Sequence, residues 1–265
     1  MRRVLGVLAI AVLVVACGDD EPAKVAAGGG DDGVLYEADT TVLESPEHGP
    51  ELCLGGVATS LPPQCGGVPV TNWDWEAVDH EDLNGTRWGS YHVVGTYDGE
   101  TFTLTEAAGP SRPQTSEPVE FPTPCPEPEG GWPGGADEMA IGDLNAWAEG
   151  QDGFAGLWIG RPGGTVVANV RVTGDVEGWE RRIGEQGYDG PLCLDVFEHA
   201  HADLRRIQDE LTAEHAGRMT MSSVDVVGNH VDLEVHAVEP GEQDALDARY
   251  GEGVVRITGA LRPVP

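Results

Sequence analysis

The chain has 265 residues, of which 46 are acidic and 15 are Lys or Arg, so its formal net charge is −31. A field of this sign repels nucleic acid, because proteins bind phosphates through Lys and Arg, and a nucleic-acid partner is therefore excluded. The charge favours solubility but does not determine a fold. The length allows one large domain or two small ones.

The first residues form a short apolar segment that follows two arginines. Arg2 and Arg3 precede residues 4–16, which are all apolar or Gly. This run is shorter than the roughly 20 residues of a membrane-spanning helix. Its length and its positive start predict a secretory signal peptide over residues 1–16.

The signal peptide ends in the sequence VVAC, which resembles the lipobox of bacterial lipoproteins. The resemblance implies that Cys17 carries diacylglycerol and a fatty acyl chain such as palmitate, and that it becomes the first residue of the mature protein. It also implies a cell-membrane location on the extracytoplasmic face, with membrane lipid as partner. The alternative is an ordinary signal peptide with an incidental cysteine. Residues 17–33, rich in Gly, Ala and Asp, predict a flexible acidic tether.

The four other cysteines predict two disulfides, because an even number of cysteines in an exported chain is usually oxidised. Three pairings are open. A short Pro- and Gly-rich loop favours Cys53–Cys65, which leaves Cys125–Cys193. Zinc bound by four cysteines is the rival interpretation, but the wide spacings lack a C-x-x-C knuckle.

Residues 34–109 predict a β-rich region. The clearest strand pair turns at Asp98–Gly99, and Phe102 and Leu104 alternate with threonines, so that one face is buried. Residues 110–136 are rich in Pro and Gly and predict a linker or a docked arm in extended geometry.

Residues 137–265 carry the clearest periodic patterns. They predict a hairpin through Pro162–Gly164, a helix capped by Asp175, and a second hairpin turning at Gly228–Asn229. Between and after these we expect a strand near 191–200, a helix near 201–217, a helix after Pro240 and a final strand near 253–261. The predicted fold class is α+β, with a β-rich, disulfide-stapled N-terminal part followed by a mixed sheet that has helices on one face.

The stretch VDVVGNHVDLEVHAVEPGEQDALDARYGEGVVRI, residues 224–257, is similar to hairpin–helix–strand units in the pro-regions of secreted bacterial serine proteases. The resemblance implies a binding or folding-helper module.

No cofactor is expected, and the alternative is calcium, for which oxygen-bearing side chains in GDLNAWAEGQDG are candidate ligands. They are Asp143, Asn145, Glu149 and Asp152. The EF-hand pattern is absent, and the acids suit a solvated loop or a helix start equally well.

Two histidines offer a zinc candidate. His199 and His201 would share a face if they lay on a strand. The favoured alternative is that they are exposed and solvated, and the histidines at 80, 92, 215, 230 and 236 are scattered.

Trp73 and Trp75 would share one face of an extended segment and offer a glycan-binding surface beside Asp74 and Glu76. Such a pair is more often core or interface. The same carboxylates suit the acid and base of a glycosidase. A serine nucleophile is not indicated, since no G-x-S-x-G occurs and Ser111 lies in a proline-rich segment.

Together these patterns favour a lipid-anchored exported protein with a non-catalytic binding or structural ectodomain, whose partner is an envelope protein or a glycan. The alternatives are a carboxylate-dependent hydrolase of cell-envelope material and a glycan-binding module.

Overall fold

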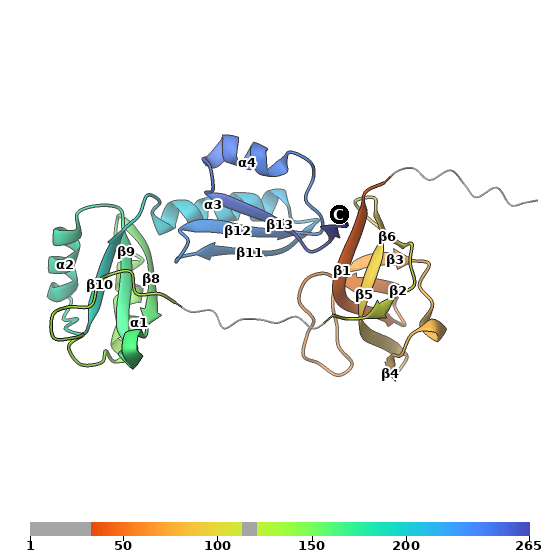
Figure 1. Cartoon of the computed structure of the whole chain (residues 1–265), viewed down its shortest axis with the longest axis horizontal. Coiled ribbons are helices and arrows are strands. Elements are labelled where there is room, and N and C mark those ends of the chain that lie inside the picture. Colours follow the sequence, from red (N-terminus) through yellow and green to blue (C-terminus); the bar gives the residue numbers. More distant parts are fainter. Residues whose placement is uncertain (1–32, 113–120) are drawn as a thin grey trace, which may run out of the picture. The chain divides into compact units, whose positions relative to one another are not determined.

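The computed structural model describes residues 33–112 and 121–265 (Figure 1). The predicted signal peptide, Cys17 and nearly all of the predicted tether lie outside the described residues. Among the residues that are described, no helix is both long and apolar enough to cross a membrane.

The N-terminal part is a closed five-stranded barrel. Its strands are β1 (Leu35–Ser45), β2 (His48–Cys53), β3 (Val68–Thr71), β5 (Thr86–Tyr97) and β6 (Phe102–Leu104). They follow one another as β1–β2–β3–β6–β5, and β5 pairs back onto β1 along nearly its whole length. Only β3 and β6 are parallel in this ring. Closure leaves the barrel strands without free edges.

Shorter elements decorate the barrel. They are η1 (Trp75–Ala77), β4 (Glu81–Leu83), β7 (Gly109–Pro110) and β14 (Arg262–Pro263). The core is formed by alternate residues of the strands, among them the fully buried Val42, Leu52 and Phe102. Each such side chain contributes about 1.5–3 kcal/mol by its burial.

The β5–β6 connection is longer than the sequence predicts. It comprises residues 98–101, because Tyr97 pairs with Phe102. The Asp98 carboxylate accepts hydrogen bonds from the amides of Glu100 and Thr101. This side chain closes the longer loop, so that Asp98–Gly99 is its first half and not a complete two-residue turn.

The next part is an αββαβ unit, here called the first module. It consists of α1 (Glu138–Ala148), β8 (Phe154–Gly160), η2 (Pro162–Gly164), β9 (Val167–Val172), α2 (Val176–Glu185) and β10 (Leu192–Val196). The sheet has the order β10–β9–β8, and α1 and α2 pack on one of its faces (Figure 1). The Asp175 side chain caps α2 by accepting from the Gly178 amide, and Trp179 and Ile183 face the core, as predicted.

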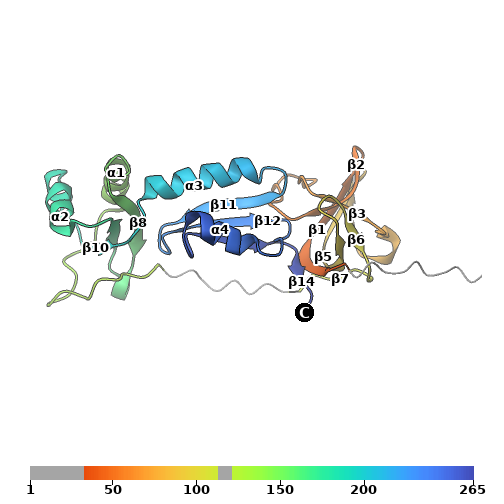
Figure 2. The same cartoon turned by 90° about the horizontal axis from the view of Figure 1, so that it is seen from above.

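The last part, here called the second module, has α3 (His201–Glu214), β11 (Met219–Asp225), β12 (His230–Val235), α4 (Glu242–Tyr250) and β13 (Val255–Gly259). Its sheet has the order β11–β12–β13. Leu204 and Leu211 of α3 and Leu246 of α4 pack against Leu233 on one face of the sheet (Figure 2).

The α+β class agrees with the prediction, and two details differ. The C-terminal strands form two separate three-stranded sheets instead of one mixed sheet. Helix α1 was not expected, although Asp137 caps it and Ile141, Leu144 and Ala148 line its buried face.

The two modules repeat the same register. Each has an antiparallel hairpin followed by a parallel crossover through a helix. The cross-strand row Phe154–Val172–Val196 corresponds to Met219–Val235–Gly259. After this row, the first strand of each hairpin, β8 or β11, has a one-residue bulge. The row that follows the bulge is Gly156–Arg171–Asp195 in the first module and Met221–Glu234–Thr258 in the second. The second module is thus a structural repeat of the first, with the bulge at the same place, and this repeat is here called the duplication.

Both predicted disulfides are present. Cys53–Cys65 closes a loop that starts at the end of β2, with a sequence separation of 12. Cys125–Cys193 spans 68 residues and ties the segment 121–128, here called the arm, to β10. The alternative of a docked arm is thus the one that is observed around Cys125.

Candidate functional site

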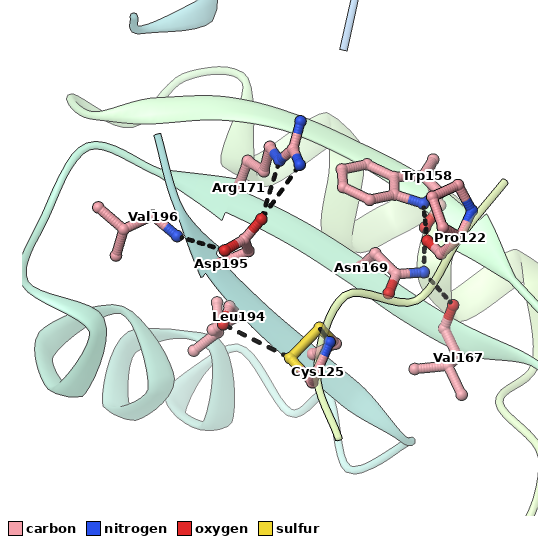
Figure 3. Close-up of a disulfide and its surroundings, with 10 residues drawn as sticks. Pro122, Cys125, Trp158, Val167, Asn169, Arg171, Leu194, Asp195 and Val196 are labelled. Carbon is pink, nitrogen blue, oxygen red and sulfur yellow. Dashed lines mark hydrogen bonds and ion pairs between the residues drawn. A yellow bond between two sulfur atoms is a disulfide. The ribbon is translucent and has the colours of Figure 1, made fainter. Parts of the chain in front are cut away.

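Each module covers one face of its sheet with helices, and the two opposite, helix-free faces differ. In the first module the arm lies on this face, tied by Cys125 (Figure 3). The Trp158 indole donates to the Pro122 carbonyl at 2.7 Å. Thr123 lies so close to Gly160 that any side chain at 160 would collide with it. The first module therefore holds an extended segment of its own chain.

Arg171 completes the filling of this face. Its guanidinium is bound to Asp195 at 3.1 Å and lies over the Phe197 ring at 3.6 Å. It also donates to the carbonyls of Val226 and Val227 in the turn of the second module. With 7% of its surface exposed, Arg171 is a buried cation whose guanidinium is bound on several sides.

The second module carries a different set of side chains at the equivalent place. The row Gly160–Val167 corresponds to Asp225–His230, and Asn169 corresponds to Asp232. One possible ligand atom from each of Asp225, His230 and Asp232 lies within 4.8 Å of the other two. Nε2 of His230 is 3.0 Å from Asp232 and 3.7 Å from Asp225.

The turn between β11 and β12 fixes this arrangement. One carboxylate oxygen of Asp225 accepts from the amides of Val227 and Gly228, at 2.8 and 2.9 Å, so the other oxygen is held toward the imidazole. A side chain at Gly228 would collide with the His230 ring. The ring is 2% exposed and packed under this turn, so it has little freedom to rotate.

The surroundings add further polar groups. Glu234 accepts from Thr220 at 2.6 Å. Arg256 stands beside Asp232 in the parallel register, and it is exposed. The face is thus polar and mainly acidic, and one nitrogen and two carboxylates converge on it. Such a donor set holds a proton or a divalent cation.

These three residues were not predicted as a set, although the sequence contains a signal for them. His230 and Asp232 are two apart on a strand and must share a face. Asp225 precedes the predicted turn and His230 follows it, so the hairpin pairs them.

The calcium candidates lie elsewhere. Asp143, Asn145 and Glu149 are on α1, and Asp152 follows that helix. The Asn145 amide donates to Glu149 one turn away, at 2.9 Å. These residues thus lie in the middle of a helix and at its C-terminal end, not at a helix start, and calcium binding there stays a prediction.

The two predicted zinc histidines do not share a strand, because β10 ends at Val196. The backbone of His199 is bonded in both directions to the Asn229 side chain. His201 begins α3 and packs edge-on against Phe154. Burial lowers the pKa of His201 below its usual value, which favours the neutral ring.

The tryptophan pair is not a flat platform. Trp75 starts η1, is 5% exposed and donates to Glu44. The Trp73 ring meets it at 71° with centroids 5.4 Å apart, which is an edge-to-face core contact. Trp73 also lines a cavity of about 300 Å³ together with Asn72 and Ala108.

The chain matches no model of a known protein family and no curated protein. The lipoprotein and pro-region resemblances therefore stay predictions.

Proposed function

We propose that this chain is a lipid-anchored exported protein with a non-catalytic binding ectodomain. The leader ending in the lipobox-like VVAC supports the anchor at Cys17. The two disulfides support an oxidising compartment, because such bonds persist outside the cytosol.

The observation that carries the binding role is the difference between equivalent faces. The first module uses its helix-free face to hold an extended segment, while the second presents Asp225, Asp232 and Glu234 at that face. Charge complementarity favours a partner with positive groups. The partner we propose is an envelope protein that lays a basic, extended segment across this face.

A hydrolase is the second candidate, because two carboxylates and an imidazole converge in the second module. The described cavities, of about 210 to 540 Å³, are lined by other residues. Binding stays the first candidate because it rests on the difference between the two helix-free faces. Turnover in a screen of envelope substrates would overturn the non-catalytic role.

The anchor is tested by mass spectrometry of the mature protein. The N-terminal peptide should begin at acylated Cys17, and Cys17→Ser should release the protein from the membrane fraction. An unmodified Cys17 in a lipoprotein-processing host refutes the anchor.

The binding face is tested by site-specific photocrosslinking in whole cells. A photoreactive residue at Ser223, on the helix-free face, should form a protein adduct, whereas one at Asp209 on the exposed side of α3 should not. Adding Asp232→Lys should abolish the adduct, and Asp209→Lys, on the exposed side of α3, should not. Equal adducts from both positions contradict the proposed face.

A further inference from the structure

We propose that Asp225, His230 and Asp232 bind one divalent transition-metal ion of the zinc class. The ligands are Nε2 of His230 and one carboxylate oxygen from each aspartate, which already lie within 4.8 Å of one another. The ion deepens the proposed function, since it sits on the proposed binding face. The metal site itself depends only on the geometry of the β11–β12 hairpin and not on the proposed protein partner.

The buried imidazole is the observation that sets this cluster apart from ordinary surface acids. His230 is 2% exposed, and its Nδ1 has no hydrogen-bond partner among the described residues. Its other nitrogen, Nε2, is 3.0 Å from the Asp232 carboxylate, so the partnered side of this buried ring points into the cluster. The turn at Gly228 packs against the ring and fixes its orientation, and a fixed orientation is what a metal-ligating imidazole needs.

The ligand chemistry selects the class of ion. Calcium and magnesium prefer sites made only of oxygen, while imidazole suits zinc, copper and nickel. Both cysteines of each pair are oxidised, so no thiolate competes in the described structure. Three protein ligands with one nitrogen and two carboxylate oxygens fit a zinc site that keeps an open position.

The ligands combine rigidity with access. Asp225 is oriented by two amides of its own turn. The side chains of Asp225 and Asp232 are 36% and 41% exposed, so solvent reaches the outer side of the cluster. An ion held here offsets the charge of the two aspartates, keeps a coordination position for water or for a donor atom of the partner, and leaves Glu234 as the acidic group of the face.

The duplication gives independent support for this location as a binding point. In the first module the equivalent positions are Gly160, Val167 and Asn169, none of which is a histidine or a carboxylate. There Thr123 of the arm occupies the space above Gly160. In the first module the arm lies on the helix-free face, and the histidine and the two carboxylates are absent. In the second module these three ligands are present, and the arm does not lie on the face.

The test is equilibrium dialysis and titration calorimetry of the mature, lipidated protein in detergent, purified without a histidine tag. We expect one Zn²⁺ per chain, displacement by Co²⁺ with a visible absorption band, and no competition from excess Ca²⁺ at this site. Asp232→Asn and Asp225→Asn should each weaken Zn²⁺ binding by at least about 10-fold, since even outer-shell losses cost that much.

Asp225→Asn is the more incisive variant, because its amide oxygen can still accept from Val227 and Gly228 and so preserve the turn. Asp209→Asn, which removes the same charge from an exposed position on α3, is the matched control and should bind Zn²⁺ normally. Thermal unfolding of each metal-free variant verifies folding. Absence of stoichiometric Zn²⁺ binding, or equal affinity in all three variants, overturns the metal site. If the protein binds Zn²⁺ but a photoreactive residue at Ser223 forms no protein adduct, only the proposed partner is overturned and the metal site stands.

Discussion

Arg171 and Glu234 occupy the same position in two copies of one module. Each is in the second strand of its hairpin, opposite the residue that follows the bulge. Arg171 is buried beneath aromatic rings, while Glu234 is bonded to Thr220 at 2.6 Å. The repeated backbone thus carries opposite charges at equivalent positions of the two faces. Because of this difference, we assign packing of the arm to the helix-free face of the first module and ligand binding to that of the second.

Replacing Arg171 tests how much the filled face contributes to stability. Arg171→Ala should lower the free energy of unfolding by about 3–5 kcal/mol, because it leaves Asp195 without its cation and empties a buried site. Urea unfolding with intact disulfides measures the loss. Arg205→Ala, on the exposed side of α3, should cost under about 0.5 kcal/mol. Similar losses in the two variants would mean that Arg171 is not a structural cation.

Removing the second disulfide should release the arm. Replacing Cys125 and Cys193 together with Ala opens a crosslink across 68 residues. Loop entropy predicts a loss of about 4 kcal/mol. Hydrogen exchange should also accelerate in β9, because the arm leaves the sheet and Trp158 of β8, the strand paired with β9, loses its acceptor at Pro122. The matched double variant at Cys53 and Cys65 should leave exchange in β9 unchanged. Unchanged protection of β9 in the first double variant would contradict the covering role of the arm.

The lowered pKa of Asp39 predicts that the barrel loses stability at acidic pH. Burial by itself would raise the pKa of Asp39, but hydrogen bonds from Arg112 outweigh it and bring the pKa below 3.8. A lowered pKa in the folded state means that the native protein binds fewer protons than the unfolded chain. The contribution of Asp39 is therefore complete above pH 3.8 and is lost as the pH falls through its lowered value.

The measurement is the urea midpoint between about pH 6 and pH 2. Asp39→Asn should be less stable than the unmodified protein at the upper end and should lose less stability on acidification. Asp209→Asn should keep the full slope. A parallel shift of the whole curve in Asp39→Asn would show that the acid sensitivity arises elsewhere.

Local patterns predicted the elements of the C-terminal half well, because their signals lie within a few residues. The alternation of Val231, Leu233 and Val235 identifies a strand, and all three are buried. The Asp175 cap and the turn at Asn229 are equally local. The signal for α1 was also local, but its acids were interpreted as cation ligands.

Long-range pairing was beyond these patterns. Leu35 pairs with Thr96, and nothing in either sequence specifies that β5 returns to close a barrel on β1. The duplication was hidden because equivalent residues such as Arg171 and Glu234 share no chemistry. The metal ligands were missed for a related reason, since Asp225 and His230 meet only when the turn is closed.

Asn229 meets two requirements of the β11–β12 turn, a positive φ and a pair of side-chain hydrogen bonds, and two variants can tell them apart. Its φ is 54°, in the left-handed region, and its amide exchanges two hydrogen bonds with the backbone of His199. Both Asn229→Gly and Asn229→Ala lose these bonds, which should cost about 1–3 kcal/mol because the groups are buried. Only Ala adds strain at positive φ, so it should be less stable than Gly by a further ~1 kcal/mol. Denaturant unfolding of the two variants measures this difference, and equal stabilities would show that the side-chain bonds alone explain why Asn occupies the turn.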